Sequence, residues 1–192
     1  QDIVWLTTNG DVSYLELFPV KPNLISRIEN GLGQVTEIAY STSLQEVALD
    51  GGLGSWKYAL PHPMIVVSEI DEYDELTQVH QRTQYRYHDG YYDGVEKQFR
   101  GYESVDIILN EEESQEGGVT VNRYDVGQLD PYRNGLLLSS EVRSGDRVLS
   151  TGQSSYDDCD LTGIPDPDLL AQQEGWGVRH ICLVRQETTI KE

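Results

Sequence analysis

The chain is poor in basic residues, and it contains no long apolar run. Its 192 residues include 33 acidic side chains against 14 basic ones, which gives a formal charge of −19 at pH 7. A surface with this excess of carboxylates repels phosphate backbones and anionic lipid headgroups, so neither nucleic acid nor membrane is expected as a partner. No run of roughly eighteen apolar residues is present, and a transmembrane helix is not expected. The start, QDIVWLTTNG, lacks the basic and apolar regions of a signal peptide, and a start without Met is typical of a fragment.

Cysteine is also scarce, since Cys159 and Cys182 are the only two in the sequence. The 22 residues between them do not give the short paired spacing that zinc ligands require, which argues against a structural zinc site. The pair is compatible with one disulfide in an oxidising compartment. Two cysteines also occur often by chance, and free thiols are the favoured expectation.

Turn signals, by contrast, are abundant, and most of them separate runs with the composition of β-strands. An Asn-Gly or Asp-Gly pair is the strongest short signal for a tight hairpin. These pairs begin at Asn9, Asn30, Asp50, Asp89, Asp93 and Asn134. The pattern predicts an all-β fold, an array of antiparallel β-hairpins with one or two short helices.

Three hairpins can be placed in the first half of the chain from the apolar patterns between these turns. Residues Asp2 to Phe18 form the first hairpin, and Leu24 to Tyr40 form the second. The apolar run Met64 to Val67 is typical of a buried strand, and its simplest partner is the strand that ends at Tyr87. Glu69 to Glu75 then forms the acidic tip of this third hairpin.

The second half contains a further hairpin after a charged loop. Strands over Gly135 to Ser140 and Arg147 to Tyr156 flank a turn and have the length of a repeat hairpin. Before them, EEESQEGG at Glu111 to Gly118 cannot bury apolar surface. This loop marks a boundary between two segments and is the first place where disorder is expected.

Two short helices are indicated by their end signals. Pro167 to Glu174 follows Asp166 as a cap, begins with proline and is closed by glycine, the usual order at helix ends. A second helix over Leu44 to Leu49 is indicated because Ser43 and Glu46 have the spacing of a capping box.

The stretch from Thr83 to Val105 is the centre of the sequence and holds five of its twelve tyrosines. Alternation in its first half predicts a half-buried strand with Tyr85 and Tyr87 on the same face. The Asp89-Gly90 and Asp93-Gly94 pairs predict that the chain then reverses in a compact aromatic corner.

The return strand is expected to run from Phe99 to Leu109. Within it, Gly101 indicates either a β-bulge or a place where a neighbouring ring lies on bare backbone. The residues expected to have structural roles in this region are Tyr85, Tyr87, Tyr91, Tyr92, Phe99, Gly101 and Tyr102. Their rings either pack in cross-strand ladders or form a sugar-binding platform, and the ladder is favoured.

Residues that could carry chemistry have simpler structural explanations. The acidic residues Asp71 to Glu75 have no aromatic pocket or apolar flank around them, so a solvated tip is expected instead of an acid–base pair. His88 beside Asp89 lacks a third, orienting group, and a surface or cross-strand position is expected for it. Asp158 to Gly163 has half of a calcium-loop pattern without the closing glutamate. We therefore expect no catalytic residue, no cofactor and no bound metal.

Three segments together resemble a known family. They are YRYHDGYYDGVEKQFRGYESV from Tyr85, KPNLISRIENGLGQVTEIAY from Lys21 and LPHPMIVVSEID from Leu60. They resemble the middle region of the B component of bacterial insecticidal toxin complexes (Tc toxins), between a β-propeller and a shell. This family is related to the rearrangement-hotspot (Rhs), tyrosine-aspartate (YD) repeat proteins of SpvB/Rhs-like type. The resemblance covers about Asp2 to Leu149.

The resemblance implies a fold and a function. Family members coil long β-hairpins into a hollow shell around a toxic C-terminal segment. By this resemblance, residues 1–20 end a preceding β-propeller-like region, residues 21–110 form a first hairpin segment, and residues 111–192 form a second with the short helix near 167–174. The implied function is that of a non-catalytic structural segment of a secreted toxin component, not an enzyme. Its partners would be the remainder of the parent toxin chain and other components of the complex. The residues alone leave two alternatives. One is a β-rich carbohydrate-binding or adhesive module, and the other is a glycosidase-like enzyme, which has only the abundant carboxylates in its favour.

Overall fold

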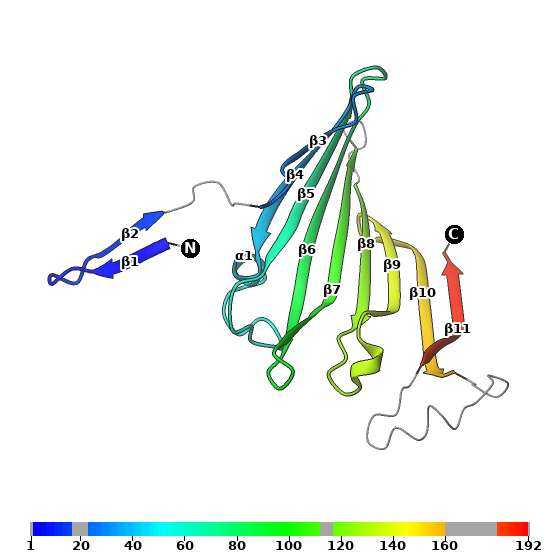
Figure 1. The fold of residues 1–192 in the computed structure, drawn as a ribbon. Helices are drawn as coiled ribbons and strands as arrows, with labels where there is room; N and C mark the ends of the chain where they lie inside the picture. Colours follow the sequence, from blue (N-terminus) through cyan, green and yellow to red (C-terminus); the bar gives the residue numbers. More distant parts are fainter. Residues whose placement is uncertain (1, 17–22, 112–116, 160–179, 192) are drawn as a thin grey trace.

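The structure is a computed structural model that describes residues 2–16, 23–111, 117–159 and 180–191 (Figure 1). In chain order its elements are β1 (Asp2–Leu6), β2 (Val12–Glu16), β3 (Arg27–Glu29), β4 (Gln34–Thr42), α1 (Ser43–Leu49), β5 (Ile65–Asp74), β6 (His80–Asp93), β7 (Gln98–Glu111), β8 (Gly118–Asp125), the 3₁₀ helix η1 (Pro131–Arg133), β9 (Leu136–Ser144), β10 (Arg147–Asp158) and β11 (Ile181–Ile190). The predicted helix over 167–174 and most of the calcium-loop pattern lie outside the described residues, as do residues 112–116 of the charged loop.

The strands form two antiparallel sheets. β1 and β2 pair as a separate hairpin, whereas β3 to β11 form a nine-stranded sheet whose spatial order is the chain order (Figure 1). The predicted all-β array of antiparallel hairpins is therefore confirmed. Within the described residues, β3 and β11 each have one neighbouring strand, so both are edge strands of the large sheet.

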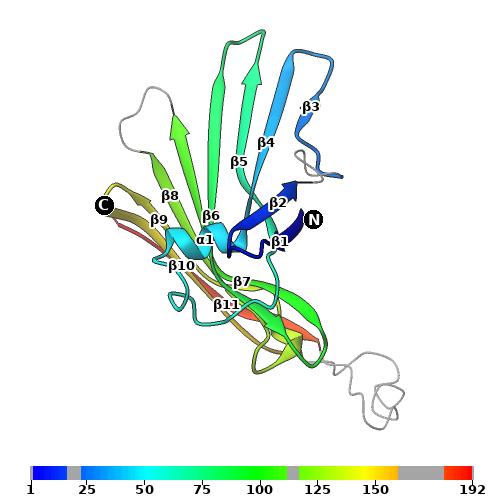
Figure 2. The ribbon, with the colours of Figure 1, turned by 90° about the vertical axis from the view of Figure 1, so that its left-hand side faces the viewer.

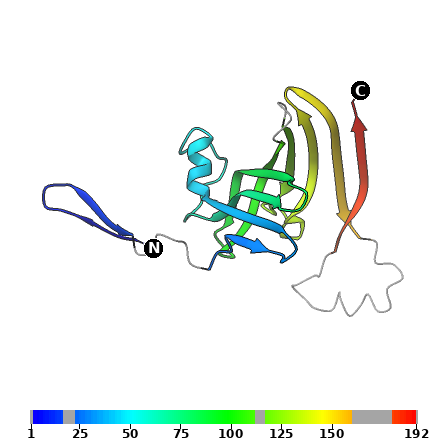
Figure 3. The same cartoon turned by 90° about the horizontal axis from the view of Figure 1, so that it is seen from above.

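The large sheet is strongly twisted, and its last strands cross the direction of the first ones (Figures 2 and 3). The β4–β5, β6–β7, β8–β9, β9–β10 and β10–β11 ladders each contain a register shift. An extra residue in one strand of a pair bends that strand and increases the local twist. One of these shifts lies opposite Gly101, which has a φ of 111°, and the predicted bulge is confirmed there.

The third hairpin differs from its prediction at the acidic stretch. β5 continues through Glu69 to Asp74, and the turn follows at Glu75 to Val79. The Asp74 carboxylate accepts hydrogen bonds from the backbone N–H groups of Leu76 and Thr77, at 2.8 and 3.1 Å. The tip is therefore fixed by Asp74, and the acidic residues before it are strand residues.

The aromatic corner also differs from its prediction. Asp89 and Gly90 remain inside β6, and the chain reverses only after Asp93, at residues 94–97. The Asp93 carboxylate accepts hydrogen bonds from the N–H groups of Val95 and Glu96, at 2.9 and 3.1 Å, and so closes this turn. Of the two predicted turn signals, the second is used.

Helix α1 begins one residue earlier than its predicted capping box. β4 ends at Thr42, which is the N-cap, and Thr42 and Gln45 form the capping box. Ser43 and Glu46, the predicted pair, are instead turned inward, and each is 1% exposed. A fully buried glutamate needs partners for its charge, and the site described below supplies them.

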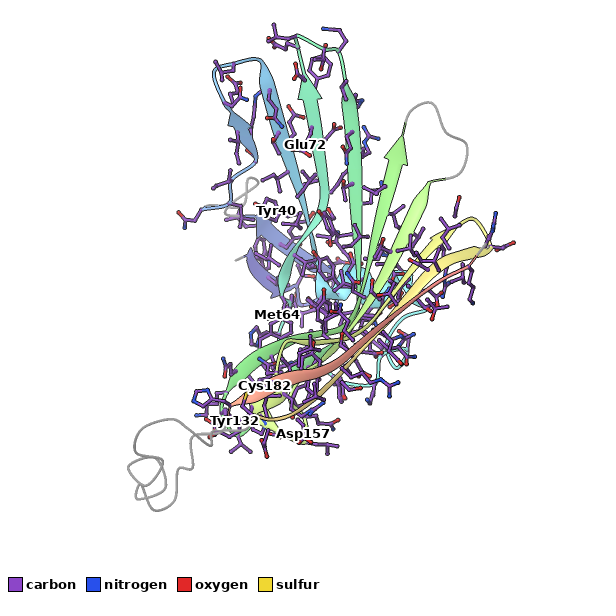
Figure 4. All side chains as sticks on the ribbon, turned by 90° about the vertical axis from the view of Figure 1, so that its right-hand side faces the viewer. Tyr40, Met64, Glu72, Tyr132, Asp157 and Cys182 are labelled. Atoms are coloured by element: carbon purple, nitrogen blue, oxygen red, sulfur yellow. A yellow bond between two sulfur atoms is a disulfide. The ribbon has the colours of Figure 1, made fainter. Side chains whose placement is uncertain are left out.

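The two cysteines are bonded, and the favoured expectation of free thiols is wrong. β10 and β11 pair so that Asp157 lies opposite Cys182, which places the Cα atoms of Cys159 and Cys182 5.0 Å apart. This separation is within the range of a disulfide. Figure 4 shows Cys182 and Asp157 at the same end of the sheet, far from Glu72 on β5.

A cluster of buried apolar residues lies at one place on the large sheet. Trp56, Val66 and Tyr102 are each 9% exposed and form a cluster. Half-buried hydrophobic residues pack around this cluster, and these are Val47, Leu60, Tyr87, Phe99 and Val105. The cluster joins β6 and β7 to the segment that connects β4 with β5.

Candidate functional site: a helix wedge held by buried charges

The site lies where β5 and β6 separate. These strands pair only between Glu69–Tyr73 and His80–Gln84, although β6 continues to Asp93 with β7 on its other side. Helix α1 and the segment after it, residues 43–64, meet the part of β6 that β5 has left (Figure 2). We call residues 43–64 the wedge.

Glu46 fastens the helix of the wedge to β6. Its side chain is 2% exposed, and its carboxylate accepts a hydrogen bond from Arg86 Nε at 3.0 Å. The same carboxylate accepts the Ser41 hydroxyl at 2.7 Å and the backbone N–H of Tyr87 at 3.3 Å. The side chain therefore satisfies a backbone donor of β6 that a neighbouring strand would otherwise pair, and this compensates for part of its own desolvation.

Asp50, at the C-terminal end of α1, is the second fastening point. It accepts hydrogen bonds from Trp56 Nε1 at 2.7 Å and from His88 Nδ1 at 2.7 Å. Arg86 also reaches it, with Nη2 3.4 Å from Oδ1. One carboxylate thus joins the helix end, the buried indole of the wedge and two side chains of β6.

A third fastening point involves Asp89, the residue of the unused turn signal. Asp89 has a φ of 54°, and its carboxylate accepts the backbone N–H of Lys57 at 2.6 Å. The Lys57 ammonium then forms an ion pair with Glu103 on β7 at 3.0 Å. These bonds hold the returning half of the wedge against the β6–β7 pair.

His88 lies between two carboxylates, neither of which is the predicted Asp89. Its Nδ1 contacts Asp50, and its Nε2 lies 3.4 Å from Asp106 on β7. The cross-strand position is thus as predicted, but the expectation that it lacks orienting groups is wrong. The hydrogen bond with Asp106, followed by that with Asp50, raises the pKa of His88 to about 9. An imidazolium held in this way is protonated at neutral pH and is a poor general base.

Aromatic rings pack around Tyr102 beneath the wedge. The ring centroids of Tyr87, Phe99 and Trp56 lie 4.9, 5.2 and 5.9 Å from that of Tyr102. A Cβ added at Gly90 would lie 2.9 Å from Tyr102 Cε1, so the bare backbone against a ring is at Gly90. At Gly101, where it was predicted as an alternative, a Cβ would meet nothing within 4 Å.

The remaining predicted aromatic residues lie beside this cluster. Tyr91 stacks at a tilt on Tyr58 of the wedge, with centroids 4.9 Å apart, and Tyr92 meets His62 edge-on at 5.6 Å. Tyr85 is half-buried on β6 and lies opposite Ile107 of β7.

Four residues of the site were not predicted from the sequence. Sequence patterns did not indicate that Glu46 contacts β6, nor did they assign a site role to Asp50, Trp56 or Gly90. The one available signal was the alternation of Trp56, Tyr58 and Leu60 in the sequence, a pattern typical of a strand with one buried face.

An open depression of about 410 Å³ lies between the wedge and the sheet, bordered by Trp56, His88 and Asp106. Within it, His88 is paired with both Asp50 and Asp106. In the described part of the chain, no group of three or more His, Cys, Asp or Glu residues is arranged to hold a metal ion. No helix among the described residues is long and apolar enough to cross a membrane. What the arrangement does chemically is to fasten the wedge to the sheet.

The fold and the site define a class of protein, an antiparallel β-sheet module in which each strand of the large sheet pairs with the next strand in the chain. The polar site of this module holds the wedge to the sheet. The sequence comparison identifies the family. The model of the insecticide toxin TcdB middle/N-terminal region matches residues 3–128, more than half of the chain. The chain belongs to this family, and the predicted resemblance to the Tc toxin B component is confirmed.

Solved structures of Tc toxins share the fold. The crystal structure of TcdB2-TccC3 without its hypervariable C-terminal region matches with a TM-score of 0.71 and 17% identity, over 97% of this chain and 12% of that chain. A Photorhabdus luminescens Tc holotoxin pore matches with a TM-score of 0.70 and 16% identity, over 88% of this chain and 10% of that one. The chain thus spans about a tenth of the length of these structures. Comparison with curated proteins gives no match.

Proposed function

We propose that this chain is a non-catalytic, structural segment of a secreted Rhs/Tc-type toxin component, part of the β-shell that encloses and delivers a C-terminal toxic domain. The observation that carries the proposal is the strand order of the nine-stranded sheet, which follows the chain order throughout. Such a sheet can be extended by further hairpins at either end, as the wall of a shell requires. Membership of the TcdB middle/N-terminal family supports the same role.

The two edges of the sheet support a role within a larger structure. An edge strand presents unpaired N–H and C=O groups and is a template for another strand. On β11, the side chains of Leu183, Val184 and Ile190 are 51, 60 and 78% exposed. In the proposal, these edges are covered by other parts of the parent toxin chain.

The β1–β2 hairpin supports the proposed division of the chain. It forms a sheet of its own, and Val4, Leu6 and Tyr14 are 62, 74 and 68% exposed. A two-stranded hairpin is marginally stable by itself in water. We therefore assign residues 1–20 to the end of a preceding β-propeller-like region, residues 21–110 to a first shell segment and residues 111–192 to a second.

The partners in this proposal are the remainder of the parent chain and the other components of the toxin complex. The solved TcdB2-TccC3 structures are consistent with such an assembly, because they combine TcdB2 with a second component, TccC3. A structural role without catalysis is supported by His88, whose charge is held by two carboxylates of the wedge site.

The alternative function, a carbohydrate-binding or adhesive module, requires accessible ring faces. Tyr87, Phe99 and Tyr102 instead pack against one another and against Trp56. Tyr91 and Tyr92 are covered in part by Tyr58 and His62. This packing favours the structural proposal, and a glycan array that yields specific binding would favour the alternative.

Sedimentation velocity of the isolated chain, combined with binding of a dye for apolar surface, tests the proposal. We expect concentration-dependent association or dye binding, because both edges of the sheet are then uncovered. Val184→Lys places a charge on the outer strand and should reduce the association. Leu129→Lys is the matched control, since Leu129 is 97% exposed but lies in the loop before η1. A compact monomer at all concentrations, without dye binding, would remove the physical basis of the proposal.

A further inference from the structure

β11 is held to the sheet along one side only. It pairs with Ser150 to Asp158 of β10, and this ladder is interrupted by a register shift between Ser155 and Tyr156. Apart from Ile181, its residues are exposed, so little apolar burial fastens it. Strands with few buried contacts and solvent-exposed hydrogen bonds are the first parts of a protein to open.

The disulfide lies at the end where the chain enters this strand. Cys182 is the second residue of β11, and Cys159 follows the last residue of β10. Beside the disulfide, the N–H of Cys159 donates a hydrogen bond to the carbonyl of His180 at 2.8 Å. At the far end of the pair, Lys191 N–H donates to the carbonyl of Leu149 at 2.8 Å. The covalent bond therefore anchors one end of a strand that is otherwise held by backbone hydrogen bonds.

We propose that the Cys159–Cys182 disulfide is a reducible lock on β11. In the oxidised protein it keeps β11 on the edge of β10. In the reduced protein β11 separates from β10 and leaves the edge of β10 open to another strand. The lock is local, and the wedge site and the β6–β7 pair remain folded in both states.

Loop closure explains why the bond controls this strand. The cysteines are separated by 23 positions in the sequence. With the bond intact, an opened β11 stays tethered beside β10 and re-forms its ladder readily. Without the bond, the ends of a long connection must be brought together again each time, at an entropic cost that β11 has little apolar burial to offset.

The opening reaction is thiol–disulfide exchange with an external dithiol. A thiolate of the dithiol attacks one sulfur of the disulfide, forms a mixed disulfide and releases the other cysteine as a thiolate, which takes up a proton. The second thiol of the reductant then displaces the remaining cysteine. Two electrons and two protons pass in total from the dithiol to the protein, which gives two cysteine thiols and a cyclic disulfide of the reductant.

The surroundings of the bond determine which reductants open it. Cys182 is exposed and Cys159 is half-buried, so a small thiol has access. Asp157 lies opposite Cys182, and Asp158 directly precedes Cys159. These carboxylates repel an incoming anion, so the thiolate of dithiothreitol, whose only charge is on sulfur, should react faster than the thiolate of glutathione, which carries further negative charge. The difference should shrink as salt screens the carboxylates. Glutathione has a single thiol, so a second glutathione molecule completes the reduction and glutathione disulfide is the product.

Hydrogen–deuterium exchange of the whole chain tests the lock, with the oxidised protein, the dithiothreitol-reduced protein and the Cys159→Ser/Cys182→Ser double variant compared. Reduction and the double substitution should each speed the exchange of β11 amides on the order of 100-fold, while β6 and β7 amides are unchanged. Unchanged exchange of β11 would overturn the proposal. So would faster exchange throughout the sheet, because the bond would then be a global staple.

The rate of reduction provides a second test. Asp157→Asn should speed reduction by glutathione more than reduction by dithiothreitol. Asp146→Asn is the matched control, because Asp146 lies in the turn at the other end of β10. Equal rates for Asp157→Asn and the unsubstituted chain would overturn the electrostatic part of the inference. A role of the lock in a shell wall rests on the proposed function, but the exchange experiment does not, so the two can fail separately.

Discussion

The carboxylate of Glu46 lies 3.3 Å from the backbone nitrogen of Tyr87 and accepts its hydrogen bond. A side chain on a helix thereby takes the place of a neighbouring strand at the edge of β6. Because the same carboxylate also carries the ion pair with Arg86 at 3.0 Å, two kinds of interaction depend on one buried group. The contact explains how a sheet can open between β5 and β6 without leaving this backbone donor unpaired.

Replacement of Glu46 should therefore be costly. Glu46→Ala leaves the N–H of Tyr87 and the Ser41 hydroxyl without an acceptor and the Arg86 charge without its nearest partner. We expect a loss of about 3 kcal/mol in the free energy of unfolding. This value is at the lower end of the range for a broken buried ion pair, because the Arg86 side chain is partly exposed to solvent. Urea titration measures it.

Glu37 offers the matched control for this substitution. It forms an ion pair with Arg27, and its side chain is 60% exposed. Glu37→Ala should change the free energy of unfolding by less than about 1 kcal/mol. Equal losses for Glu37→Ala and Glu46→Ala would show that burial of the wedge charges contributes nothing.

The stability of the chain should depend on pH through His88. Its pKa is about 9 in the folded protein, against about 6.5 when unfolded. Since folding raises the pKa, the stabilisation is fully present below about pH 6.5 and is lost as the pH rises through about 9. We expect a loss of about 1–2 kcal/mol between pH 6 and 9.5, a value discounted because part of the side chain is exposed.

His88→Asn should remove this dependence, as measured by urea titration across the same pH range. His62→Asn is the control, because His62 is exposed near the C-terminal end of the wedge and should leave the slope in place. If the slope survives in His88→Asn, another group is responsible for it.

Gly90 is predicted to be intolerant of any side chain. An added Cβ would lie 2.9 Å from Tyr102 Cε1, 3.1 Å from Leu60 Cδ1 and 3.2 Å from Trp56 Cζ3. Gly90→Ala should therefore destabilise by about 1–3 kcal/mol through overpacking. Gly94→Ala, in the adjacent turn with nothing within 4 Å, should stay within about 0.5 kcal/mol. Thermal unfolding of both variants decides the point, and a harmless Gly90→Ala would contradict the packing described.

Phe99 is predicted to contribute to the core. Its ring packs 5.2 Å from that of Tyr102 in the cluster with Trp56 and Val66. Phe99→Ala should lower the free energy of unfolding by roughly 3 kcal/mol, at the low end for an aromatic core residue because the ring is half-buried. A loss below about 1 kcal/mol in denaturant titration would revive the sugar-platform interpretation.

Tyr102→Phe should raise the free energy of unfolding, whereas Phe99→Ala should lower it. The Tyr102 hydroxyl is buried without a hydrogen-bond partner among the described residues, and burial raises its pKa. Removal of an unpaired buried hydroxyl with the ring left in place should stabilise the chain by about 1 kcal/mol. A rise in the urea midpoint with an unchanged slope is the expected result, and a clear fall would mean that the hydroxyl is bonded in solution.

The fold was largely predictable because most of its turn chemistry is local. Asn9, Asn30 and Asp93 each begin a pair that lies where the chain reverses. Asp89 begins an equally good pair, yet the strand continues through it. The difference is tertiary: Asp89 bonds the wedge backbone at Lys57, and Gly90 lies beneath rings that come from the wedge and from β7.

The site could not be predicted from the sequence, because its contacts are also tertiary. The residues joined by its main contacts are far apart in the chain, as Glu46 and Arg86 are 40 positions apart and Asp50 and His88 are 38. No short pattern links them. The sequence prediction placed the acidic residues of β5 at a hairpin tip, which is wrong, because their partners belong to the next strand. Asp71, for example, pairs with Arg82 and His80 on β6. In a chain rich in carboxylates, a charge run does not reveal which charges are paired.

The chain-ordered sheet has a consequence for how the protein acquires its structure during synthesis. Each strand from β4 onward can pair with the strand that left the ribosome just before it, so no strand has to wait for a distant partner. The wedge is the exception, because residues 43–64 must remain unpaired until β6 emerges. Nascent chains that end before β6 should therefore hold an open helix segment, and the arrival of Arg86 and His88 is the step that closes the first half of the sheet.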